Sequence, residues 1–342
     1  MRTIEWKDGV IVTLDQTLLP DREVWIEMRS CFEVAEAIKE MKVRGAPLIG
    51  VAAAYGLALT AFYSKAKNRE EFLREIEHSA SILKRTRPTA VNLFWAVDRI
   101  LEKIKNTLGD VEFLRRTIIK EAQNLADEDV AVNKKIGEYG SRLICDGDTI
   151  LTHCNAGRLA TVDYGTALAI VRVAWEDGKN IKVIATETRP KLQGARLTAY
   201  ELTRDGIPVT LITDNMVGYV MSKGLINKVI VGADRIVRDA VVNKIGTYTI
   251  AVLAHEHNIP FYVAAPLSTF DLSIFARDVI IEERDPEEVT QIRSIRISPI
   301  GVSALNPAFD ITPLKYVDAI ICEKGILNKE DFKRLAEKGG VE

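Results

Sequence analysis

Cys154 is the residue whose type and position most directly suggest chemistry. It follows the short apolar run 149–153, so we expect it at the carboxyl end of a buried strand, facing the N-terminus of a helix that starts near Leu159. A helix N-terminus lowers the pKa of a thiol and favours the reactive thiolate. A free cysteine at a strand end is also commonly a small buried hydrophobic residue. From spacing alone, both interpretations stay open.

Polar residues follow the next apolar runs in the same way. Glu187 and Gln193 follow the second run, Asp214 the third and Asp234 the fourth. Ligands of open parallel sheets bind at the carboxyl ends of the strands, so these side chains would line the rim of an active site. The same residue types also cap helices in any protein. A lone carboxylate such as Asp234 is more often structural than catalytic.

Two arginines precede prolines that favour the first turn of a helix. Arg44 comes before Pro47, and Arg87 comes directly before Pro88. A cation at a helix N-terminus is electrostatically disfavoured unless it meets a bound anion. The pair therefore suggests a phosphate site, with solvated or ion-paired arginines as the alternative.

Several familiar signatures are missing from the sequence. It contains neither the G-x-x-x-x-G-K-[ST] phosphate loop nor the G-x-G-x-x-G fingerprint, so a nucleotide is not implied. His255 and His257 lack the spacing that places two histidines on one helix face, so we predict no metal site there. Lys244 is expected to be solvated.

Length and composition describe an ordinary globular protein. With 342 residues, two domains are the natural expectation, at roughly 100–200 residues each. The net charge of −2 provides no excess of positive charge that would favour binding to nucleic acid or anionic membranes. Four cysteines without a C-x-x-C pair, and no apolar run in the first residues, favour the cytoplasm. The uncharged stretch 46–64 is long enough to span a membrane, but its many small residues favour a buried helix.

The spacing of apolar residues changes near residue 145 and predicts two domains. Residues 1–145 begin with short alternating strands and continue at helical spacing from about 30 to 143. Residues 146–342 contain apolar runs that alternate with helical segments, which is typical of a parallel sheet covered on both faces. We therefore predict an α/β protein, with a mainly helical N-terminal domain and a Rossmann-like, doubly wound C-terminal domain. The predicted strands lie at 149–153, 181–186, 208–213, 228–232, 261–265 and 318–322.

Eight motifs in order along the chain resemble the 5-methylthioribose-1-phosphate isomerase family. They cover most of the chain from about residue 44 to 325. The motifs are RGAPLIG (44–50), RPTAVNLFW (87–95), LTHCNAG (151–157) with LAT (159–161), ETRPKLQGARLT (187–198), VGADR (231–235), NKIGTY (243–248), PFYVAAP (260–266) and NPAFD (306–310).

The resemblance implies a homodimeric enzyme of methionine salvage. The enzyme would convert the aldose 5-methylthioribose 1-phosphate into the ketose 5-methylthioribulose 1-phosphate, without a cofactor or metal. It implies Cys154 and Asp234 as the catalytic pair. The implied substrate contacts are Arg44, Gly45, Ala46, Arg87, Gln193, Asn243 and Lys244.

This reaction requires an acid that opens the sugar ring and a second group that assists the transfer of hydrogen from C2 to C1. Phosphate on the anomeric carbon prevents ordinary ring opening, so an acid must protonate the ring oxygen. We assign that role to Asp234, which must then be kept protonated by burial. Hydrogen then moves from C2 to C1. Cys154 either acts as the base of an enediolate-like route or stabilises charge during a hydride shift. We expect apolar residues of the N-terminal domain to line the methylthio end.

Three positions depart from the family pattern. Arg158 and Thr186 stand where many members have a small residue and Asp, and the segment 234–243 is shorter than expected. Two alternatives remain. One is ribose-1,5-bisphosphate isomerase of nucleoside salvage, which would need a cationic pocket in place of an apolar one. The other is a binding protein like the regulatory subunits of a translation-initiation exchange factor.

Overall fold

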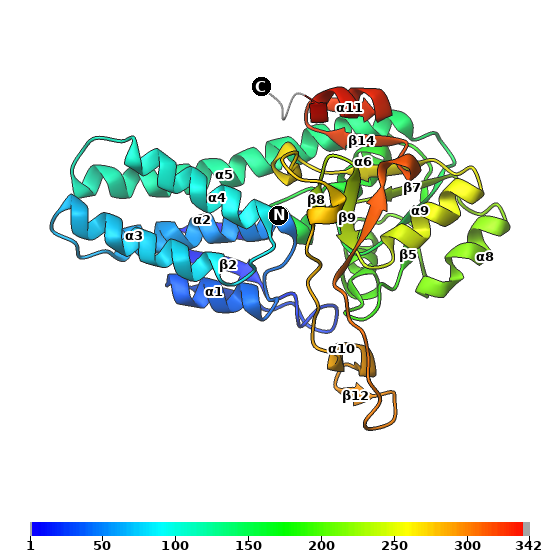
Figure 1. Ribbon diagram of the computed structural model, residues 1–342, viewed down its shortest axis with the longest axis horizontal. Coiled ribbons are helices and arrows are strands. Elements are labelled where there is room, and N and C mark those ends of the chain that lie inside the picture. Colours follow the sequence, from blue (N-terminus) through cyan, green and yellow to red (C-terminus); the bar gives the residue numbers. More distant parts are fainter. Residues whose placement is uncertain (1, 338–342) are drawn as a thin grey trace. The chain divides into compact units, whose positions relative to one another are not determined.

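A computed structural model describes residues 2–337, and its contacts divide the chain into two compact units (Figure 1). Unit 1 comprises Met1–Asn133 and Arg158–Gly165, and unit 2 comprises Lys134–Gly157 and Thr166–Glu342. This division differs from the expected boundary at 145/146, because one long helix continues past residue 133 and a short segment after Cys154 groups with unit 1. The predicted α/β class, with a mostly parallel sheet, is confirmed.

Unit 1 begins with a three-stranded antiparallel meander and continues as helices, as the sequence predicted. Ser30 and Glu33 form a reciprocal capping box at the first helix, and Asn68 caps the third. The elements are β1 (Ile4–Lys7), β2 (Val10–Leu14), β3 (Trp25–Met28), α1 (Cys31–Lys39), α2 (Ala46–Tyr63), α3 (Arg69–Lys84), α4 (Val91–Lys105) and α5 (Val111–Gly140).

Helix α2 is the centre of the unit 1 core. By length and apolarity it is the one membrane-span candidate among residues 2–337, but 72% of it is buried inside the protein. Its small residues allow neighbouring elements to approach closely. A Cβ at Gly50 would lie 2.8 Å from the Asn92 carbonyl oxygen, and one at Gly56 would contact Leu83. Both glycines therefore serve contacts within the chain.

The segment that follows Cys154 does not form the predicted helix near Leu159. Arg158–Ala160 is a single 3-10 turn, η2, and the next α-helix, α6, begins at Ala167. Tyr164 and Gly165 both adopt left-handed backbone conformations, which interrupt a right-handed helix. The helix-dipole argument for a reactive thiol at Cys154 is therefore wrong.

Unit 2 is built on a seven-stranded sheet of order β15-β14-β10-β7-β4-β5-β6. All six predicted apolar runs are strands of this sheet, and they pair in parallel. Strand β15 adds an antiparallel edge. The strands are β4 (Thr149–Thr152), β5 (Lys182–Thr186), β6 (Val209–Ile212), β7 (Lys228–Val231), β10 (Phe261–Ala264), β14 (Ala319–Cys322) and β15 (Gly325–Asn328).

Helices flank this sheet in the chain order expected for alternating strands and helices. They are α6 (Ala167–Glu176), α7 (Ala199–Arg204), α8 (Val217–Ser222), α9 (Thr247–Glu256) and α11 (Lys329–Glu337).

Two further features of unit 2 were not predicted. The first is a small antiparallel sheet of order β13-β9-β8, whose members are β8 (Arg235–Ile236), β9 (Ala240–Lys244) and β13 (Phe309–Pro313). The second is an arm, residues 279–308, that extends away from the body of unit 2 (Figure 1). The arm carries α10 (Glu287–Thr290) and the short hairpin β11 (Gln291–Ile292) and β12 (Ile295–Arg296).

The carboxyl of Asp129 on α5 makes the stability of unit 1 depend on pH. It accepts the main-chain N–H of Val162 at 2.7 Å, and burial raises its pKa from 3.8 to about 7. Between about pH 4 and 7 the folded state therefore holds a proton that the unfolded state has lost, so stability falls as pH rises.

We expect Asp129→Asn to remove this part of the pH dependence, since an amide oxygen still accepts the Val162 N–H without titrating. The free energy of unfolding of the wild type should fall relative to that of the variant from about pH 4 to 7, by at most about 4 kcal/mol at about 1.4 kcal/mol per pKa unit. Urea unfolding across this range measures the difference. Parallel curves for the two proteins would contradict the assignment.

Candidate active site

Cys154 lies just past the end of β4 in a left-handed backbone conformation, with φ of 61°. Such a φ is uncommon for a residue other than glycine and must be held by its surroundings. Two threonine hydroxyls hold it. Cys154 N–H donates to Thr188 Oγ1 at 2.9 Å, and Thr198 Oγ1 donates to the Cys154 carbonyl at 2.6 Å. The thiol side chain itself remains partly exposed.

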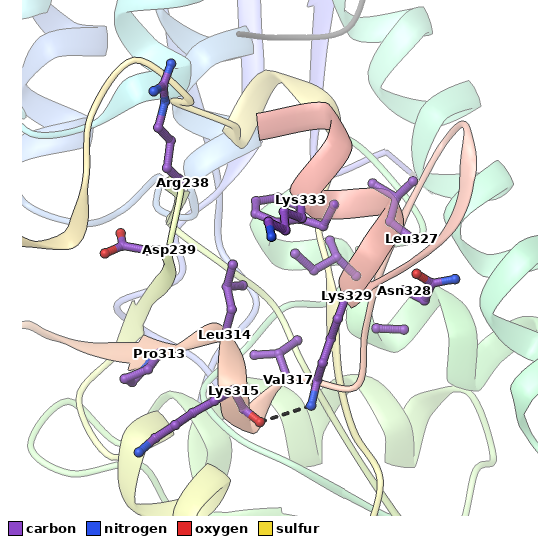
Figure 2. Close-up of a pocket in the computed structure, with 13 residues that line it drawn as sticks. Arg238, Asp239, Pro313, Leu314, Lys315, Val317, Leu327, Asn328, Lys329 and Lys333 are labelled. Atoms are coloured by element: carbon purple, nitrogen blue, oxygen red, sulfur yellow. Dashed lines mark hydrogen bonds between the residues drawn. The ribbon is translucent and has the colours of Figure 1, made fainter. Parts of the chain in front are cut away.

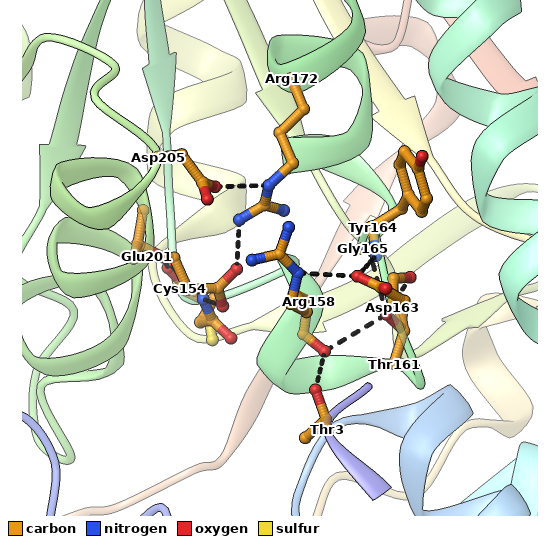
Figure 3. Close-up of polar contacts among 12 residues, drawn as sticks. Thr3, Cys154, Arg158, Thr161, Asp163, Tyr164, Gly165, Arg172, Glu201 and Asp205 are labelled. Carbon is orange, nitrogen blue, oxygen red and sulfur yellow. Dashed lines mark hydrogen bonds and ion pairs between the residues drawn. The ribbon is translucent and has the colours of Figure 1, made fainter. Parts of the chain in front are cut away.

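A buried ionic network lies against the loop that carries Cys154 (Figure 3). The amide of Asn155 donates to Glu201 at 2.9 Å, and Glu201 pairs with Arg172 at 2.7 Å, both side chains being 3% exposed. Arg172 also pairs with Asp205 at 2.6 Å. A Cβ at Gly157 would overlap the Glu201 carboxylate. The loop is therefore shaped to fit this network.

His153, directly before Cys154, is held as a neutral imidazole. Its Nε2 faces the Ile245 carbonyl at 2.8 Å and must donate to it. Its Nδ1 then accepts from the hydroxyl of Thr186 at 2.6 Å. Burial lowers the pKa of His153. The departure at Thr186 thus places a neutral donor beside a neutral histidine.

Lys244 lies within electrostatic reach of Asp234 and Cys154 in unit 2. The N–H of Asp234 donates to the Val242 carbonyl at 3.0 Å, which ties the carboxyl end of β7 to β9. Lys244, at the end of β9, is 3% exposed and donates to the Ala308 carbonyl at 3.0 Å. Burial lowers the pKa of Lys244, whereas the charges of Cys154 and Asp234 oppose that shift.

Two expectations for these residues are wrong. Lys244 is not solvated, because pairing of β9 with β13 sets it opposite Phe309 inside the small sheet. Asp234 does not cap a helix, since the residues after it form β8.

Gln193 and Asn243 are also buried in unit 2, at 5% exposed each. Gln193 Oε1 has no hydrogen-bond partner among the described residues, so it suits a hydroxyl donor from a ligand. Gly194 after it approaches the Thr186 carbonyl so closely that a Cβ would overlap it. Asn243 donates to Thr247 at 3.0 Å.

Asp310 is a titratable member of this region that sequence reasoning missed. It lies opposite Asn243 in the β9–β13 pair. It accepts the N–H groups of Gly246 at 2.7 Å and Tyr248 at 3.1 Å. Burial raises the pKa of its carboxyl to about 6. The motif 306–310 contained it, but nothing in the spacing pointed to a strand pairing with residues more than 60 positions earlier.

The remaining expected contacts belong to unit 1. Arg44 lies directly before the N-cap of α2, as predicted, and is 6% exposed. Gly45, with φ of 101°, packs on Ala160, since a Cβ there would lie 2.6 Å from the Ala160 Cα. Ala46 opens the helix.

Arg87 is partly exposed, and the helix that follows it starts later than expected. Helix α4 begins at Val91 rather than at Pro88, because 87–90 form a turn closed by the Ala90 N–H and the Arg87 carbonyl.

A cavity of about 440 Å³ in unit 2 contains none of these residues (Figure 2). Apolar side chains such as Leu314 and Phe332 line it, with lysines at its rim. Its one carboxyl, Asp239, already accepts the Ala276 N–H at 2.7 Å. The cavity therefore holds no set of groups suited to acid–base chemistry.

Comparisons with known proteins identify the family to which the chain belongs. The model of the Initiation factor 2 subunit family matches residues 42–329. The chain is 56% identical over 330 residues to methylthioribose-1-phosphate isomerase of Acetivibrio thermocellus, covering 96% of each chain.

Two crystal structures are also similar to the whole chain. One is 5-methylthioribose 1-phosphate isomerase from Pyrococcus horikoshii OT3, at 49% identity and a TM-score of 0.92, covering 98% of this chain and 95% of that one. The other is described as translation initiation factor eIF-2B, subunit delta, from A. fulgidus, at 54% identity and a TM-score of 0.87, covering 96% of each. The names of the relatives thus span an enzyme and a translation factor.

We expect Thr198→Val to destabilise the protein, because it strands the Cys154 carbonyl and removes an acceptor of the Asn155 amide. The loss should be about 1–3 kcal/mol, the range for buried groups left without a partner. Thr198→Ser, which keeps the hydroxyl, should lose less. Urea unfolding compares the two variants, and equal stabilities would contradict a role for the hydroxyl.

Proposed function

The chain belongs to the initiation factor 2 subunit family, and we propose that it is the family's isomerase that converts 5-methylthioribose 1-phosphate into 5-methylthioribulose 1-phosphate in methionine salvage. The observation that carries this proposal is that the buried Lys244 lies within electrostatic reach of Cys154 and Asp234, which follow strands β4 and β7 of unit 2. Close relatives with this name cover nearly the whole chain.

The geometry of unit 2 supplies the groups that the reaction needs. Asp234, whose main-chain N–H is tied to β9, is the proposed acid that protonates the ring oxygen. It is only partly buried, so burial by itself does not keep it protonated as the sequence expectation required. Lys244 places a buried positive charge near Cys154, and such a charge favours the thiolate. Gln193 offers an acceptor to a sugar hydroxyl. Arg44, Gly45, Ala46 and Arg87 of unit 1 remain predicted contacts of the substrate.

Two routes would move hydrogen from C2 to C1 of the opened sugar. In the first, Cys154 removes the C2 proton and returns a proton to C1 through an enediolate. In the second, hydride passes directly from C2 to C1. Deuterium placed on C2 distinguishes them, because only the direct route must retain the label in the ketose.

We expect the purified protein to form ketose from 5-methylthioribose 1-phosphate in preference to ribose 1,5-bisphosphate. Cys154→Ser and Asp234→Asn should each lower kcat by at least about 100-fold, the lower range for loss of a general acid or base. A ketose-specific assay with each sugar separately measures this preference.

Other outcomes of this assay point to the two alternatives. Preference for the bisphosphate would move the protein to nucleoside salvage with the same catalytic pair. Turnover of neither sugar would favour the binding-protein function that the name of the A. fulgidus structure suggests.

We also propose that the protein is a homodimer and that the arm 279–308 contributes to its interface. Aliphatic side chains are strongly exposed along the arm, including Ile295 at 70%, Ile300 at 90% and Leu305 at 85%. Clusters of exposed apolar residues on soluble proteins mark interaction sites. A second copy is the partner that the family resemblance implies.

We expect the double variant Ile295→Asp with Ile300→Asp to shift the protein from dimer to monomer, because charges would then be buried at the interface. Light scattering after size exclusion measures the mass. Leu108→Asp is the matched control, because Leu108 is 89% exposed in unit 1, outside the arm. A dimer that survives the double variant would remove the arm from the interface.

We propose the cytoplasm as the location. Its reducing conditions suit the free thiols of this chain, of which Cys31 and Cys322 are buried.

A further inference from the structure

Gln16 is a buried residue of unit 1 that has no assigned role in the proposed reaction. It follows β2 and is 1% exposed. Its main-chain N–H donates to the Lys42 carbonyl at 3.1 Å. Its side-chain Oε1 accepts from Arg44 Nε at 2.8 Å, and its Nε2 donates to the Leu159 carbonyl at 2.7 Å. One amide thus joins Arg44 to the segment that follows Cys154 in the chain.

The bond at Nε fixes the direction in which Arg44 presents its guanidinium. The group is planar, so a partner at Nε sets the plane and the direction of the fork formed by the two terminal nitrogens. Forks of this kind bind phosphate in a bidentate manner, and their strength depends on the angle of approach. An orienting partner of Arg44 therefore controls how well the arginine meets a phosphate.

The chemistry of the partner matters as much as its position. A carboxylate at position 16 would pair with Arg44 and cancel much of its charge, which would compete with a bound anion. The amide of Gln16 is neutral, so it orients the guanidinium without itself neutralising the positive charge.

The other end of Gln16 is anchored to main chain that is itself held in place. Thr3 donates its N–H to Val162 and its hydroxyl to Arg158, both within the segment 158–165. Gly45 packs on Ala160 in the same segment. Because the anchor is the carbonyl of Leu159, the amide is held at both ends and its orientation is unambiguous.

We propose that Gln16 is a positioning residue that orients Arg44 for the phosphate of the substrate and sets its distance from the Leu159 segment. This inference rests on the proposed function insofar as it takes Arg44 to contact the sugar phosphate. Gln16 itself contacts no substrate in this proposal and acts through Arg44.

The first test replaces Gln16 with the nearly isosteric, apolar methionine. Gln16→Met should raise KM for 5-methylthioribose 1-phosphate by about tenfold, the size expected for one hydrogen bond to a charged group, with a smaller change in kcat. Inorganic phosphate binding, measured by calorimetry, should weaken in parallel. Thr13→Val is the control, since Thr13 is fully buried nearby and donates to the Thr3 carbonyl. It should lower stability and leave KM unchanged.

A double-mutant cycle decides whether Gln16 acts through Arg44. In an Arg44→Lys background, Gln16→Met should have little further effect on KM, because the Nε partner is already lost. Additive effects on KM would show a general structural role and overturn the inference. If Gln16→Met fails to fold, the neutral and apolar Gln16→Leu replaces it in the same cycle, with the same expected effects on KM.

The outcome separates this inference from the proposed function. An unchanged KM in a variant of an active wild type would overturn the role of Gln16 alone. A wild type that turns over neither sugar, but binds phosphate more tightly than Gln16→Met does, would overturn the proposed function and leave the inference standing.

Discussion

The left-handed backbone at Cys154 is the constraint on which the site in unit 2 depends. A β4 strand that simply continued would carry the thiol on along the strand direction. The turn at φ of 61° redirects it, and hydroxyls from two other segments, Thr188 and Thr198, hold that turn. Asn155, Glu201 and the other buried groups then hold the next residues of the loop. The polar groups around Cys154 thus serve mainly to hold the main chain of this loop in its conformation.

The features that could be predicted from the sequence are those encoded by local patterns, whereas contacts between distant segments could not be predicted. The six strands were predictable because each is a short run of apolar residues that ends at a turn, which is local information. The candidate site residues at the ends of those strands were predicted from the same pattern and from the family resemblance, and their roles stay predictions. The burial of Lys244 did not, because it depends on pairing between 240–244 and 309–313, a contact that no local pattern encodes. The helix expected at Leu159 failed for a related reason. Tertiary hydrogen bonds to Thr3 and Gln16 hold this segment in a short turn instead.

The family contains both enzymes and translation factors, so the overall fold does not by itself decide between them. Chemistry decides it. A binding protein has no need to bury a lysine beside a thiol and a carboxyl, since a buried ammonium is costly unless its charge is used. Lys244 bears that cost: burial lowers its pKa, while Cys154 and Asp234 favour its charged form. This arrangement is what a site that moves protons requires, and it favours the enzyme over the binding protein.

In each unit, a neutral side chain forms the hydrogen bond that orients a basic side chain: Thr186 orients His153, and Gln16 orients Arg44. Thr186 donates to the neutral His153 where a carboxylate would raise the histidine's pKa and invite a proton. Gln16 holds Arg44 at Nε where a carboxylate would neutralise it. In both cases a neutral hydrogen bond fixes orientation and leaves the charge state unchanged. Orientation and charge can therefore be set separately, because a neutral partner aligns each side chain without adding a charge of its own.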